Sequence, residues 1–140
     1  MDCPLCTTSR DDIVWQDGHC RVILTADPDY PGYCQVIWGE HVAEMSDLAA
    51  DGQRRLIDVV LATERALRVL LDPDKINLAS LGNRVPHLHW HVIARFADDA
   101  HFPESIWGRA QRPGRLRAGL ERNALSRQIT AELSRASVIP

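Results

Sequence analysis

Three histidines alternate with apolar residues in one short run, at positions 87, 89 and 91. Side chains two residues apart point to the same face of a β-strand, because the side-chain period of a strand is 2. The spacing therefore predicts a strand with three imidazoles on one face. The residues between and after them, Leu88, Trp90 and Val92, fall on the opposite face, where they can be buried. Such a strand brings three imidazoles to one site that is backed by a hydrophobic wall.

Imidazole can act as a nucleophile, as an acid–base catalyst or as a metal ligand. Its unperturbed pKa of about 6.5 lies close to physiological pH, so one histidine can attack while a neighbour donates or accepts a proton. A site made only for metal normally adds a ligand close by, and the next histidine, His101, is ten residues downstream of His91. A polar strand face without chemistry is the remaining alternative. The three alternating histidines therefore favour a catalytic site over a site made only for metal and over a polar strand face.

The run from His87 to Ile93 resembles the motif of the histidine triad (HIT) family, and all seven positions match. The preceding residues, 81–85, are similar to the segment that leads to the triad in this family. The similarity extends from about Cys3 to about Trp107. The resemblance implies a fold of helices and strands, a homodimer, and nucleotidyl transfer or hydrolysis at phosphorus.

The resemblance also assigns roles to the three histidines. His89 would attack the α-phosphorus of a purine nucleotide substrate, and water would then cleave the nucleotidyl-histidine. His91 would bind the phosphoryl oxygens and help to protonate the leaving group, and His87 completes the catalytic set. The substrate class stays open between adenosine phosphoramidates and dinucleoside polyphosphates. The alternative function is a nucleotide- or zinc-binding module with little turnover that serves protein interaction.

Three further residues are nucleotide-binding candidates by the same resemblance. Asp27 stands where the family places an acidic side chain that accepts the ribose hydroxyls, although an ordinary loop aspartate before a proline is the alternative. Asn83 replaces the usual glutamine and can still donate to a phosphate, and Ser80 is a candidate phosphate contact. Arg84 departs from the usual serine or threonine. No organic cofactor is expected.

The N-terminal Cys3-Pro4-Leu5-Cys6 is either a redox pair or half of a zinc site. It precedes a predicted hairpin, whereas a redox pair usually opens a helix in a βαβ unit. Some HIT proteins bind zinc through such a pair, a histidine after the third strand and the first triad histidine. The matching ligands here are Cys3, Cys6, His41 and His87, and the zinc would be structural. A reduced pair without metal is the alternative, and Cys20 and Cys34 are expected to be small buried thiols.

Length and charge narrow the class of protein. A chain of 140 residues is large enough for one domain with a real core. Its net charge of −3 offers no basic footprint for nucleic acid. No apolar run approaches the ~18 residues that a membrane span needs. The N-terminus lacks the regions of a signal peptide, so a cytoplasmic location is expected.

Periodicity and turn residues predict the elements that position these residues. Strands are expected at residues 12–16, 19–25, 33–38, 76–80 and 85–94, a long helix at 51–71 and a C-terminal helix at 121–134. The predicted fold class is α+β: a HIT-like antiparallel β-sheet with one long helix packed on it and a C-terminal helix. Residues 1–107 are expected to form the HIT domain, and residues 108–140 a C-terminal helical extension of the same domain.

Three side chains outside the motifs also carry expectations. Trp90 should lie under the long helix, because alternation turns it away from the histidines. His101 and Trp107 can shape the rim of the pocket, although a hydrophobic anchor for the tail is the favoured role for Trp107. The five arginines between Arg109 and Arg122 are expected to form a solvated surface.

Overall fold

One five-stranded antiparallel sheet carries the histidine run, with the strand order β1-β2-β3-β5-β4. The computed structural model describes residues 3–7 and 11–136. Its elements are β1 (Ile13–Gln16), β2 (Cys20–Leu24), β3 (Tyr33–Trp38), the short 3-10 helix η1 (Met45–Asp47), α1 (Ala50–Leu71), β4 (Lys75–Ala79), β5 (His89–Arg95) and α2 (Arg122–Ala136).

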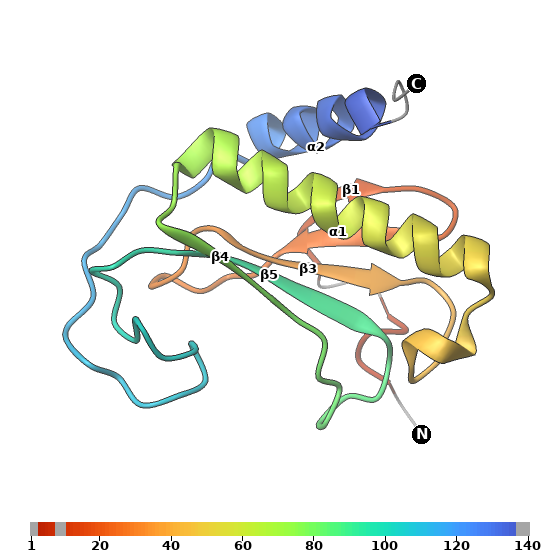
Figure 1. Ribbon diagram of the computed structural model, residues 1–140, viewed down its shortest axis with the longest axis horizontal. Helices are drawn as coiled ribbons and strands as arrows, with labels where there is room; N and C mark the ends of the chain where they lie inside the picture. The colour runs from red at the N-terminus through yellow and green to blue at the C-terminus, as the bar shows by residue number, and fades with distance from the viewer. Residues whose placement is uncertain (1–2, 8–10, 137–140) are drawn as a thin grey trace.

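The two helices lie on the same side of the sheet. Figure 1 shows α1 crossing the sheet with α2 beside it, while the first part of the chain that follows β5 lies on the other side, from which the chain returns to α2. Fully buried valines at positions 22, 36 and 92 form the middle of the sheet face that meets α1. We call this face the helix face, and the opposite one, which carries His89 and His91, the histidine face.

The helix α1 forms because its apolar residues recur on one side. Leu56, Val60 and Leu67 are buried at this spacing against the sheet. The helix ends at Asp72, which adopts a left-handed conformation (φ 46°, ψ 57°) and donates its N–H to the carbonyl of Arg68. Among the described residues, no helix is long and apolar enough to cross a membrane.

The α+β fold with a long and a C-terminal helix is confirmed, but several predicted bounds are wrong. The triad strand begins at His89 and not at residue 85, so His87 precedes the strand. Pro86 has no N–H to donate, and the N–H of His87 turns back to the carbonyl of Val85 (2.8 Å). The strand predicted from His19 begins at Cys20.

Two expectations about side chains are resolved by the packing. Trp90 packs against the core cluster of the helix face, as predicted, and donates its indole N–H to the sulfur of Met45 (3.5 Å). The arginine-rich stretch is not simply a solvated surface. Arg117 lies 3.6 Å from the centre of the Phe96 ring and pairs with Asp98 (2.7 Å).

Candidate functional site

The histidine run occupies the centre of the histidine face. In the pairing of β5 with β3, His89 stands opposite Ile37 and His91 opposite Gln35. The two imidazole rings lie edge to face, with centroids 5.0 Å apart. All three histidines are buried: His87 is 0% exposed, and His89 and His91 are each 8% exposed. Two of the three imidazoles predicted to share a strand face, His89 and His91, therefore do so, whereas His87 precedes the strand and its ring lies beside Cys3 and Cys6.

His89 is held by the backbone of the run itself. Its Nδ1 lies 2.5 Å from the carbonyl oxygen of His87. A carbonyl only accepts hydrogen bonds, so Nδ1 must carry the proton. The lone pair is then on Nε2, the ring nitrogen that can attack an electrophile.

His91 is neutral in this environment. Burial lowers its pKa to about 4, and the neighbouring His89 contributes in the same direction. Its Nδ1 lies 2.8 Å from the hydroxyl of Tyr33, whose own pKa is raised by burial. A phenol that keeps its proton can donate to Nδ1, which leaves the Nε2–H of His91 as a donor toward the site. The sequence reasoning missed Tyr33.

Trp107 closes the other side of His91. Its indole meets the His91 ring edge to face, with centroids 4.9 Å apart, and the side chain is 49% exposed. The favoured expectation for Trp107, a hydrophobic anchor for the tail, is therefore wrong. An anchor would be buried, whereas this indole lies at the rim of the site beside a triad histidine.

The four predicted metal ligands come together although they are far apart in sequence. The Nδ1 atoms of His41 and His87 are 3.2 Å apart, and the nitrogen–sulfur distances within the cluster are 3.3 Å (Cys6 to His41) and 3.5 Å (Cys3 and Cys6 to His87). All four ligand atoms lie within 4.8 Å of one another. Ordinary zinc bond lengths in a tetrahedron place two nitrogens about 3.3 Å apart and a nitrogen and a sulfur about 3.6 Å apart. The cluster fits zinc.

The protonation state of the His87 ring is the one that a metal ligand needs. Its Nε2 lies 2.6 Å from the carbonyl oxygen of Trp38, so Nε2 donates and the lone pair of Nδ1 faces the cysteines. Burial also lowers the pKa of His87, which favours the neutral form that binds metal. By contrast, burial raises the pKa of Cys20 and of Cys34 to about 12, so both are inert thiols, as expected from their positions within strands.

The nucleotide-binding candidates are placed unequally. Burial raises the pKa of the Tyr33 hydroxyl, and the charge of the Asp27 carboxylate contributes in the same direction. Asn83 is exposed in the loop between β4 and β5. Ser80 donates its hydroxyl to the carbonyl of His89 (2.9 Å), so this donor braces the strand.

A cavity of about 520 Å³ lies beside Asp27, between the β2–β3 loop and residues 117–120. Thr25 is one of its lining residues, and the Thr25 hydroxyl is the only buried side-chain oxygen or nitrogen without a hydrogen-bond partner in residues 3–7 and 11–136. Thr25 was not predicted, because nothing in the sequence distinguishes it from other strand-end threonines. Thr25 and Asp27 line the cavity together with Leu24 and Leu120, which pack against the core cluster of the helix face.

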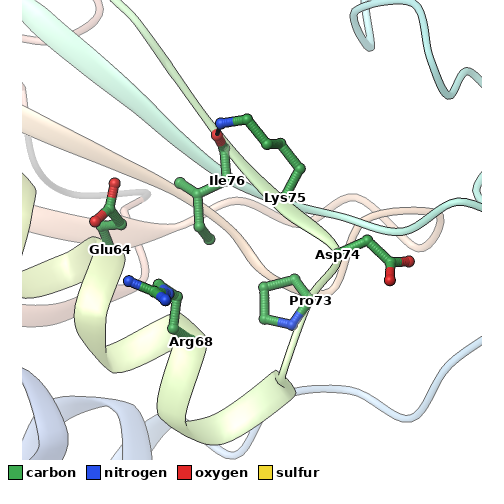
Figure 2. A pocket seen from close by; sticks show the side chains of 6 residues that line it. All are labelled: Glu64, Arg68, Pro73, Asp74, Lys75 and Ile76. Atoms are coloured by element: carbon green, nitrogen blue, oxygen red, sulfur yellow. Dashed lines mark hydrogen bonds between the residues drawn. The ribbon is translucent and has the colours of Figure 1, made fainter.

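Another cavity, of about 230 Å³, lies away from the triad at the C-terminal end of α1 (Figure 2). Its lining residues are Glu64, Arg68, Pro73, Asp74, Lys75 and Ile76. The ammonium group of Lys75 donates to the carbonyl of Ile76 (2.8 Å), and the Asp74 carboxylate accepts the N–H of Ala97 (2.7 Å). The charged groups of Lys75 and Asp74 thus form hydrogen bonds within the protein, and no triad residue lines the cavity.

Comparisons with known proteins agree with this geometry. Residues 7–98 match the model of the HIT domain. A histidine triad protein from Bradyrhizobium japonicum is 29% identical, with a TM-score of 0.66 over 89% of this chain and 90% of that one. A histidine triad protein from Sinorhizobium meliloti is 25% identical, with a TM-score of 0.71 over 89% and 92%.

A zinc-bound histidine triad family protein from Mycobacterium smegmatis has the same fold, with 21% identity and a TM-score of 0.60 over 92% of this chain and 88% of that one. No match is found among the curated proteins. Since the family model covers more than half of the chain, the protein belongs to the histidine triad family.

Proposed function

We propose that the protein is a nucleotide hydrolase or nucleotidyl transferase that acts at the α-phosphorus of adenosine phosphoramidates or dinucleoside polyphosphates. The observation that carries the proposal is the His89 ring, whose Nδ1 is fixed by the carbonyl of His87. A fixed tautomer keeps the Nε2 lone pair available without a separate general base. Membership of the HIT family supports the same chemistry.

In the first step, Nε2 of His89 forms a bond to phosphorus, and the bond from phosphorus to the leaving nitrogen or oxygen breaks. The electron pair of that bond goes to the leaving group, which takes up a proton. The Nε2–H of His91 donates to a phosphoryl oxygen and helps to supply this proton, and the Tyr33 hydroxyl replaces it at Nδ1 of the same ring. In the second step, water attacks phosphorus, the electron pair of the phosphorus–nitrogen bond returns to Nε2 of His89, and a proton of the water passes back through His91 to Tyr33 as the nucleoside monophosphate is released.

The nucleoside is proposed to bind beside Asp27. One oxygen of the Asp27 carboxylate accepts the N–H of Asp29 (3.0 Å), which orients the side chain in the loop. The other carboxylate oxygen is proposed to accept the hydroxyls of the ribose. Asn83 is proposed to contact the phosphate from the loop that precedes the triad, and Ser80 would do so by turning its hydroxyl from the carbonyl of His89 to the phosphate.

A structural zinc ion is proposed at Cys3, Cys6, His41 and His87. Its role is to tie the N-terminal segment to the sheet and to fix the His87 ring. The fit of the four ligand atoms supports the proposal, and so does the zinc-bound relative from Mycobacterium smegmatis.

We also propose that the protein is a cytoplasmic homodimer. Residues 1–107 would form its HIT domain and residues 108–140 a C-terminal helical extension of that domain. A twofold pair is the commonest oligomer. Sedimentation at micromolar concentration is expected to give the mass of two chains, and a monomer mass would contradict the proposal.

The nucleotidyl-histidine is tested by mass spectrometry after brief exposure to adenosine 5′-phosphoramidate. The unmodified chain should gain one adenylyl group, and His89→Ala should gain none. His19→Ala is the matched control, because His19 is an exposed histidine that stacks on Trp38, and it should label normally. Nucleotide binding without an adduct and without turnover would favour the alternative, a nucleotide- or zinc-binding module that serves protein interaction.

A further inference from the structure

A fully buried arginine lies on the histidine face, four residues after His91. Arg95 is 1% exposed, and its guanidinium is 2.8 Å and 3.0 Å from the two carboxylate oxygens of Asp99. It also donates to the side-chain oxygen of Asn77 (2.7 Å) and to the carbonyl of Glu104 (2.7 Å). One side chain thus joins β5, β4 and the segment that follows β5.

Asp99 completes this arrangement from the other side. Its carboxylate accepts the backbone N–H groups of Phe96, His101 and Phe102 (3.1, 3.0 and 2.7 Å). Burial alone would raise the pKa of Asp99, but Arg95 and these N–H groups outweigh it and hold the pKa well below its usual range. The carboxylate is therefore charged at neutral pH, and it fixes the turn at the start of residues 99–107.

The other end of residues 99–107 carries Trp107. The carbonyl that Arg95 holds belongs to Glu104, three residues before the indole. Trp107 reaches back to the His91 ring from there. From outside, Arg112 donates to the carbonyls of Asp99 and Phe102 (2.7 Å each), so the segment is fastened on both sides.

Stability alone does not explain a buried ion pair, because an apolar pair of similar volume often stabilises a fold as well or better. What an apolar pair lacks is a rigid fork of donors that can reach several separate acceptors at once. We propose that Arg95 is a positioning residue: by fixing residues 99–107 it sets the contact between Trp107 and His91. The catalytic consequence rests on the proposed role of His91, whereas the ring contact can be measured without substrate.

The test is the NMR spectrum of the His91 ring protons in the full chain. The ring current of the Trp107 indole alters the chemical shifts of these protons, so Trp107→Ala gives their chemical shifts without the contact. Arg95→Met should change the chemical shifts most of the way to those values. Arg21→Met is the matched control: Arg21 is also a buried arginine of the histidine face, but it binds Asp11 (2.7 Å) and the carbonyl of Leu5 (2.8 Å). Arg21→Met should leave the chemical shifts of the His91 ring protons unchanged.

Two milder variants keep the test decisive if Arg95→Met does not fold. Arg95→Lys retains the charge but cannot reach three acceptors, so it should shift the His91 protons part of the way. Arg112→Met removes only the outer, exposed contacts and should give a smaller shift in the same direction. Wild-type ring shifts in both of these variants, or in a folded Arg95→Met protein, would overturn the proposal.

Turnover of adenosine 5′-phosphoramidate then separates this inference from the proposed function. Displacement of a catalytic group by about 1 Å can cost about 100-fold in rate, so Arg95→Met should lower kcat by about that factor, with a smaller change in KM. If the wild-type chain shows no turnover while the ring shifts behave as expected, the proposed function fails and the positioning role stands. Shifted rings with wild-type kcat would refute a catalytic consequence of the contact.

Discussion

The two faces of the sheet are buried by different physics. The helix face is covered by α1 through apolar contacts around Val36, Val92 and Leu67. The histidine face is covered by two loop segments, each fastened by a buried arginine: Arg21 holds the N-terminal residues, and Arg95 holds residues 99–107. Apolar packing is non-directional, whereas hydrogen bonds to an arginine fix position. Apolar packing on the helix face therefore mainly stabilises the fold, whereas the buried arginines of the histidine face mainly fix the positions of the two loop segments.

The strongest challenge to this division is His89→Ala. We expect turnover to fall by several orders of magnitude, because the proposed nucleophile is lost, while the urea midpoint falls only by the cost of the cavity that one buried imidazole leaves. Steady-state kinetics and urea unfolding of the same preparation provide the measurement. Near-normal kcat would remove His89 from the mechanism.

The proposed zinc site allows a test of whether the N-terminal residues need bonds to a metal, in addition to the hydrogen bonds of Arg21, to stay on the histidine face. Purified protein should contain about one zinc per chain, and its removal by a chelator should lower the free energy of unfolding by about 4 kcal/mol if free zinc is near 1,000 times its Kd. Elemental analysis and thermal unfolding measure both. Cys3→Ser should lose the metal, while Cys34→Ala, at a buried thiol of the helix face, should retain it.

A zinc content below about 0.2 per chain, with the cysteines reduced, would contradict the site. Retention of zinc by Cys3→Ser together with Cys6→Ser would place the metal elsewhere.

The helix face is tested by Trp90→Ala, a neighbour of His89 in sequence. Loss of the indole leaves a cavity next to the core, and we expect a cost of about 3 kcal/mol, the low end of the usual range because the side chain is only partly buried. Urea unfolding measures it, with Trp107→Ala as the control at the half-exposed rim. An unchanged midpoint in Trp90→Ala would mean that the two strand faces are not separated as described.

The smallest expected effect concerns pH. The pKa of His91 is lowered to about 4 in the folded chain, whereas an unfolded histidine titrates near 6.5, so the unfolded state binds the extra proton first. Stability should therefore fall, by about 2.5 kcal/mol, as the pH drops from about 6.5 to about 4. Unfolding of His91→Gln across this range should lose that component. An identical pH dependence in the variant would show that His91 is not the group responsible.

Local pattern predicted the helix face well. The apolar repeat of α1 and the alternation around Trp90 depend on neighbours within a few residues, so the sequence displays them directly. The triad strand begins at His89, four residues later than predicted, because Pro86 has no N–H for the pairing.

The histidine face was predicted in part. Its histidines and metal ligands were found through a motif and a family resemblance, while Tyr33 and the Arg95 contacts were not. Tyr33 meets His91 across 58 residues, and Arg95 joins Asn77 across 18. Contacts of this kind follow from strand order and register, which no local spacing reveals.

His87 serves the two halves of the site through different atoms. Its side chain faces the cysteines, while its backbone carbonyl orients His89. Every amino acid has that carbonyl, so the tautomer of the nucleophile does not depend on which residue occupies position 87. The proposed metal site and the proposed chemistry are thus separable: replacement of this histidine and both cysteines would remove the zinc ligands and leave the carbonyl that orients His89.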